Sequence, residues 1–87
     1  MRYSVSQSVR TQQLDDELIL LDLRGGEYFS LNASGAQVWR ALEAGTPLEM
    51  MAQELGGDWP VDVGQRRQLI QALVDDLCAR GLLRTVD

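Results

Sequence analysis

One stretch decides the fold of this chain: Gly26-Glu27-Tyr28-Phe29-Ser30-Leu31-Asn32-Ala33-Ser34-Gly35-Ala36-Gln37-Val38-Trp39. Its first half, residues 27–31, is short and aromatic and predicts a β-strand. Its second half predicts a helix that begins at once, because Ser34 is followed by Gln37 at the spacing of a capping box. An apolar segment, residues 18–23, comes before it, and the turn Arg24-Gly25-Gly26 between the two is typical of a hairpin.

Three short strands are expected before that helix. The first combines Val5 and Val9 with residues 10–14, the second spans residues 18–23, and the third spans residues 27–31. The second strand is apolar on both faces, whereas a sheet with one covered face alternates more cleanly between apolar and polar residues. Its second face is therefore expected to meet the N-terminal segment, another copy or a partner.

A second helix is expected after residue 46. Thr46 would cap it, Pro47 would occupy the first helical position, and Glu49 would complete a capping box. Gly56-Gly57 would end it. In the loop that follows, Trp59 is expected to cover the end of the helix bundle or to stay partly exposed.

The third helix is the longest. Asp62 and Gln65 open it, it runs to about Arg80, and Gly81 is expected to stop it in a left-handed conformation, so that residues 82–83 fold back onto the core. Strands followed by helices indicate an α+β protein. The expected fold is winged helix-turn-helix-like, a three-stranded antiparallel sheet followed by three α-helices.

The composition describes one small acidic domain. The chain has 87 residues, which predicts a single domain over residues 1–87, with residues 1–6 frayed. Eight basic residues, all arginine, stand against 13 acidic residues and give a net charge of −5. Such a domain is repelled by nucleic-acid phosphates unless a local basic face overcomes the net charge, so no nucleic-acid partner is expected.

The lack of histidine and the single cysteine, Cys78, exclude several chemistries. An intrachain disulfide, the usual His/Cys zinc sites, and Ser-His or Cys-His nucleophilic pairs all need residues that the chain lacks. We expect no catalytic residues, no metal and no cofactor. No run approaches the roughly 18 apolar residues of a membrane span. Residues 1–13 are polar rather than signal-like, so a cytoplasmic protein with no membrane partner is expected.

The strand at residues 27–31 is the first candidate binding site. As the last strand of its sheet it is expected at an edge, where free backbone N–H and C=O groups can accept a peptide as an added strand. Tyr28 and Phe29 point to opposite faces, so one is expected in the core and the other in a groove or a partner contact. An ordinary edge, protected by its short length, is the alternative.

The long helix is the second candidate. The core direction is covered by Ile70, Leu73, Val74 and Leu77. Arg66 and Leu69 lie at one flank of this apolar stripe and are expected to face a groove. The alternative is that the whole stripe belongs to the core.

A winged-helix DNA-binding regulator is a different class of function. Arg66 and Arg67 lie in a short polar cluster on the helix that would enter the major groove. Asp62, Asp75 and Asp76 share that helix, and together with the net charge they argue against this class. A purely structural subunit of a larger enzyme is a third class.

Several short motifs follow one another in a distinctive order. They are Asp15-Asp16, Leu20-Leu21-Asp22, Gly25-Gly26, Tyr28-Phe29, Leu31-Asn32, Gly35-Ala36 and Arg80-Gly81-Leu82-Leu83. In this order, over about residues 5–84, the chain resembles the PqqD-like family of peptide-recognition domains. The resemblance is greatest to the standalone proteins of lasso-peptide biosynthesis, and it implies the winged-helix arrangement expected above.

The resemblance implies a carrier and not an enzyme. Such domains bind the leader segment of a ribosomally made precursor peptide as a strand beside the third strand, in the groove with the third helix. By position, the backbone hydrogen bonds would come from Glu27, Tyr28, Phe29, Ser30 and Leu31, the apolar pockets from Leu69, Ile70 and Leu73, and the rim from Arg66 and Asp76. A phase error of about 100° on the helix would replace the helix positions with Gln68, Ala72 and Asp75.

The resemblance also implies partner enzymes. In lasso-peptide systems these are a leader peptidase and an ATP-dependent macrocyclase. The alternative is a PqqD-type peptide chaperone for a radical enzyme. Leu18 and Leu20, on the strand that is apolar on both faces, are the expected docking surface for the peptidase.

Overall fold

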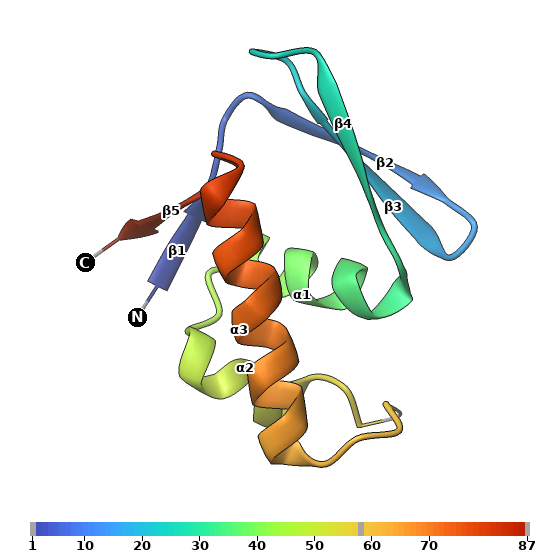
Figure 1. Cartoon of the computed structure of the whole chain (residues 1–87), viewed down its shortest axis with the longest axis vertical. Coiled ribbons are helices and arrows are strands. Elements are labelled where there is room, and N and C mark those ends of the chain that lie inside the picture. The colour runs from blue at the N-terminus through green and yellow to red at the C-terminus, as the bar shows by residue number, and fades with distance from the viewer. Residues whose placement is uncertain (1, 58, 87) are drawn as a thin grey trace.

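The computed structural model describes residues 2–57 and 59–86, and within them the chain forms an α+β domain (Figure 1). The elements in chain order are β1 (Arg2–Val5), β2 (Val9–Leu14), β3 (Glu17–Asp22), β4 (Glu27–Leu31), α1 (Ala33–Glu43), α2 (Leu48–Glu54), α3 (Val63–Ala79) and β5 (Leu83–Val86). None of the helices among these residues is long and apolar enough to cross a membrane.

The larger sheet has the antiparallel order β2-β3-β4. Its register places Leu20 of β3 opposite Thr11 of β2 and Phe29 of β4. A three-stranded antiparallel sheet is found, and its third strand has the predicted bounds, residues 27–31. The predicted first strand is wrong in part, because Val5 belongs to β1 and only residues 9–14 form β2, so four strands precede the first helix and a fifth follows the last. In Figure 1 this sheet lies at the upper right, and α3 crosses in front of the other two helices.

A second sheet, β1 paired with β5, corrects the prediction for the N-terminal residues. Residues 2–5 are a strand and not a frayed end, because their hydrogen-bonding partner is the far end of the chain, with Arg2 opposite Val86. Met1, the first residue of the segment predicted to be frayed, lies outside the described residues. The prediction that residues 82–83 fold back onto the core is confirmed, since Leu82 and Leu83 are both buried.

Two of the three predicted helix caps are wrong. Helix α1 is capped by Asn32, whose Oδ1 accepts a hydrogen bond from the Gly35 N–H at 2.9 Å, and not by Ser34. Helix α2 begins after Pro47, which makes no side-chain cap, so the capping box from Thr46 does not form. The cap of α3 is confirmed, because Asp62 accepts from the Gln65 N–H at 2.8 Å.

Gly81 ends α3 as predicted. Its φ of +78° is left-handed, a region that glycine enters without steric cost. The Gly81 N–H donates to the Cys78 carbonyl and the Leu82 N–H to the Leu77 carbonyl, each at 3.0 Å, which is the Schellman pattern. The turn directs Leu82 and Leu83 into the core.

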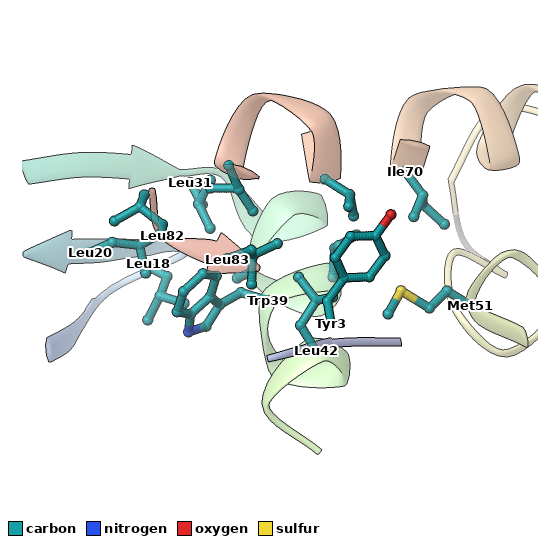
Figure 2. Close-up of a cluster of buried hydrophobic side chains, with 14 of the residues drawn as sticks. Tyr3, Leu18, Leu20, Leu31, Trp39, Leu42, Met51, Ile70, Leu82 and Leu83 are labelled. Atoms are coloured by element: carbon teal, nitrogen blue, oxygen red, sulfur yellow. The ribbon is translucent and has the colours of Figure 1, made fainter. Parts of the chain in front are cut away.

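The core lies between the inner face of the larger sheet, the helices and the β1–β5 ribbon (Figure 2). Trp39 of α1 packs there, and Met51 of α2 and Ile70 of α3 lie at the other end of the cluster. Leu18 and Leu20 are 1% and 0% exposed within it. The prediction that they form a docking surface is therefore wrong: their face of β3 is covered by the protein's own helices.

Candidate functional site

Strand β4 forms one edge of the larger sheet. In the described part of the chain it pairs with β3 alone, so one row of its backbone N–H and C=O groups is left without a strand partner. Leu31 is buried and Phe29 is half-buried on the inner face, whereas Tyr28 is 72% exposed on the outer face. Such an edge can pair with an extended peptide.

An apolar pocket of about 480 Å³ opens where β4 ends. Its walls come from the end of β4, the start of α1, the loop before α3, and one face of α3. The lining residues are Ser30, Leu31, Asn32, Ser34, Gly35, Val38, Trp59, Pro60, Val61, Leu69, Ile70 and Leu73. Gly35 allows this close junction, since a Cβ at this position would already lie 3.2 Å from the Leu31 Cβ.

Helix α3 brings three of the predicted residues to this pocket, Leu69, Ile70 and Leu73. Leu69 is 54% exposed at the mouth of the pocket, whereas Ile70 is only 2% exposed and forms its floor. From β4, Ser30 and Leu31 also line the pocket. The structure thus places five of the ten predicted peptide-binding residues around one cavity.

The other predicted residues lie elsewhere. Glu27, Tyr28 and Phe29 lie farther up β4 and outside the pocket. Arg66 turns toward the loop after α2, where its Nη1 donates to the Gly56 carbonyl oxygen at 2.6 Å. Asp76 accepts from Arg80 Nε at 3.1 Å, one turn along the helix.

The alternative helix phase fits this cavity less well. Gln68, Ala72 and Asp75 are all exposed, and none lines the pocket. Asp75 instead accepts a hydrogen bond from Gln71 Nε2 at 2.8 Å along the outer face of α3.

Arg80 joins the two sides of the groove at its other end. Its guanidinium carbon lies 4.6 Å from the centre of the Phe29 ring, a cation–π distance, and so links α3 to β4. Asp76 holds the same guanidinium from the helix side. The groove between β4 and α3 is therefore apolar near the pocket and polar near Arg80.

The outer face of the larger sheet is a separate apolar surface. Leu21 and Tyr28 are opposite each other across β3 and β4, and both are exposed. With Ile19 and residues 10–12 of β2 they border a shallow hollow of about 360 Å³. We call this surface, formed by Ile19, Leu21 and Tyr28, the outer patch.

The described residues offer little reactive chemistry. They contain no cluster of three His, Cys, Asp or Glu side chains placed to hold a metal ion. Burial raises the pKa of the Cys78 thiol, and the nearby charge of Asp75 raises it further. A thiol that keeps its proton is a poor nucleophile, because the thiolate is the reactive form.

Trp59, Pro60 and Val61 belong to the pocket but were missing from the predicted site. The expectation that Trp59 covers the end of the bundle or is partly exposed is close to the observed position, half-buried at the pocket wall. A tryptophan and a proline in a short loop between two helices were the available signal. The sequence alone does not indicate the direction in which that loop folds.

Comparison with known proteins gives two kinds of match. The family model described as coenzyme PQQ synthesis protein D (PqqD) matches residues 17–83. Among solved structures, the chain is similar to TbiB1 in complex with the TbiA(beta) leader peptide, with 28% identity, a TM-score of 0.86, and 97% of this chain and 98% of that chain covered. It is also similar to a lasso peptide synthetase B1 complexed with its leader peptide, with 28% identity, a TM-score of 0.87, and 98% and 100% covered. No curated protein matches.

Proposed function

Because the chain belongs to the PqqD family, we propose that it binds the leader segment of a ribosomally made precursor peptide and presents it to separate maturation enzymes. The observation that carries this proposal is the unpaired edge of β4 beside the apolar pocket. The leader would add to the sheet as a strand along β4, and one of its apolar side chains would enter the pocket.

Both similar structures are named as complexes with a leader peptide, and the name lasso peptide synthetase B1 of one of them favours the lasso-peptide pathway. A leader peptidase and a macrocyclase would then be the client enzymes. A PqqD-type chaperone for a radical enzyme is the second candidate, favoured by the description of the matching family model. We interpret the arrangement of α1, α2 and α3 against the sheet as a winged helix.

A non-catalytic role is part of the proposal. The pocket is lined mainly by apolar side chains, and the raised pKa of Cys78 makes that thiol a poor nucleophile, which supports a binding role. DNA binding is disfavoured by the net charge of −5, and of the two arginines considered for it Arg66 already donates one hydrogen bond to the Gly56 carbonyl.

Delivery to a client enzyme needs a second surface, and we assign it to the outer patch. Leu21 and Tyr28 expose apolar surface that nothing in the described chain covers. A leader strand added at β4 would extend the same sheet, so its outward side chains would continue the outer patch. A client enzyme docked there would contact the carrier and its cargo together.

The proposal is tested with a fluorescent synthetic leader taken from a precursor gene next to this one, titrated into the protein and followed by anisotropy. Alternate residues of an edge strand point their N–H groups toward the neighbouring strand or toward the open edge. Phe29→Pro and Ser30→Pro therefore form a pair: besides the side chain that each replaces, one removes a backbone hydrogen bond to β3 and the other removes a free N–H at the open edge.

We expect saturable binding to the wild type. We also expect that one proline variant keeps its circular dichroism spectrum and thermal unfolding midpoint yet binds at least tenfold more weakly. Full affinity in every proline variant that folds would contradict strand addition at β4. A folded wild-type protein that binds no leader would contradict the proposed function.

A further inference from the structure

We propose that the loop between α2 and α3, and Trp59 above all, determines which leader side chain the pocket accepts. This inference rests on the leader-binding function proposed above. The loop contributes Trp59, Pro60 and Val61 to the pocket, and these residues face Leu69 and Leu73 of α3.

The pocket wall formed by Trp59 favours apolar side chains of the leader. Its only ring donor, Nε1, is used by Gln37 of α1, whose Oε1 accepts the hydrogen bond at 3.2 Å. The indole therefore offers an occupant no free N–H. An apolar side chain packs against this wall, whereas a polar side chain finds no free hydrogen-bond donor on the indole.

Hydrogen bonds to Gly56 hold this wall of the pocket in place. The Gly56 carbonyl oxygen accepts from Arg66 Nη1 at 2.6 Å and from the Trp59 backbone N–H at 2.9 Å. Gly56 has a φ of +78°, and a Cβ there would lie 2.7 Å from Arg66 Cδ and 2.7 Å from Trp59 Cδ2. The close approach of Arg66 and Trp59 leaves no room for a side chain at position 56.

Arg66 is consequently a positioning residue and not a contact for the leader. It belongs to α3, the helix that also carries Leu69 and Leu73 on the opposite wall. Its hydrogen bond to Gly56 fixes the distance between the two walls. A pocket with walls joined in this way keeps one width, and a fixed width discriminates between side chains of different size.

The closing experiment uses leader peptides in which each apolar residue is replaced in turn by Ala, Leu, Phe and Trp. Their affinities are measured for the wild type and for Trp59→Ala, which widens the pocket, and Val61→Phe, which narrows it. The expected result is a shift of at least tenfold in relative affinity at one and the same leader position, toward larger side chains for Trp59→Ala and toward smaller ones for Val61→Phe.

Two further variants separate positioning from packing. Arg66→Gln should weaken discrimination at the same leader position while the affinity for the best peptide falls less. Trp59→Phe should restore most of the wild-type preference, because it keeps an apolar ring in the wall. Met50→Ala, which removes an exposed apolar side chain from α2 outside the pocket, serves as the control and should leave the preference unchanged.

The outcomes keep this inference apart from the function on which it rests. If the wild type binds the leader but the wall variants that fold weaken every peptide equally, the loop is structural and the inference is overturned, while the function stands. If the wild type binds no peptide, the function itself fails. Because Trp59→Ala and Val61→Phe act in opposite directions, loss of folding in one still leaves the other to decide.

Discussion

The two faces of β3 are made of the same kind of residue but have opposite surroundings. Leu18 and Leu20 are buried beneath the helices, whereas Ile19 is half-buried and Leu21 is 37% exposed on the outer patch. Apolar content does not separate the two faces, because either would be suitable for a core. The separation comes from the helices, which follow β4 and pack on one side of the sheet only. A strand that is apolar on both faces can therefore have one face in the core and one exposed face, and its sequence does not say which is which.

The largest expected effect tests the buried face. Leu20→Ala should lower the free energy of unfolding by about 2–5 kcal/mol, because it leaves a cavity in a well-packed core. This is a large part of the stability of a small domain. Urea unfolding followed by circular dichroism measures it. Leu21→Ala, one residue away on the other face, should change the free energy by about 0.5 kcal/mol or less. Equal losses would mean that the outer patch is also part of the folded core.

The next effect tests the exposed face. Leu21→Asp should leave leader affinity intact but lower the rate of leader removal by the client peptidase about tenfold, because a buried charge in a docking interface weakens association by roughly 1–2 kcal/mol or more. The measurement is leader cleavage by the purified peptidase at a subsaturating concentration of the carrier. Gln53→Asp, an exposed position on α2, is the charge-matched control. An unchanged rate in Leu21→Asp would remove the outer patch as the docking surface.

A smaller effect concerns the junction that places the helices on one face. Asn32→Ala should cost about 1 kcal/mol, the usual value for a lost N-cap, since the Gly35 N–H would lose its partner. Ser34→Ala should cost less, because Ser34 is not the cap. Both values come from urea unfolding. A larger loss for Ser34→Ala would restore the capping box that the sequence predicted.

The smallest effect is a pH dependence at the edge of the core. Burial and Asp75 raise the pKa of Cys78, so the folded protein holds this proton to higher pH than the unfolded chain does. The contribution of this protonated thiol to the free energy of unfolding is therefore complete below the ordinary thiol pKa. It is lost as the pH rises through the pKa of Cys78 in the folded protein. Unfolding free energies from pH 7 to about pH 10 should fall more steeply for the wild type than for Cys78→Ala. Identical slopes would contradict the pKa shift.

Predictions from local patterns are partly right. The bounds of β4, the Asp62 cap and the Gly81 stop are found, whereas the Ser34 and Thr46 caps are not. Among predictions that depend on distant segments, the packing of residues 82–83 onto the core is confirmed, and two others are wrong. Residues 2–5 are ordered only because residues 83–86 pair with them, and the buried face of β3 is set by where the helices pack.

In the candidate site, predictions from helical spacing are found, whereas those that depend on the path of a loop are not. Leu69, Ile70 and Leu73 could be chosen from helical spacing, and they do line one cavity. Arg66 was expected at the rim but donates to Gly56, because the loop between α2 and α3 folds back over the first turn of α3. The path of that loop decides which residues contact it and which pocket wall it forms. No periodic pattern in the sequence indicates this path.

The β1–β5 ribbon has a mechanical consequence. Arg2 and Val86 are opposite each other at one end of this antiparallel pair, and Val5 and Leu83 at the other (Figure 1). A force that pulls the two ends of the chain apart would load the hydrogen bonds of the ribbon one after another, as in a zipper, and not all together. The ribbon would open first, at low force, while β4 and α3 remain unloaded. Tension on the chain ends would thus be absorbed by the ribbon before it reaches the groove.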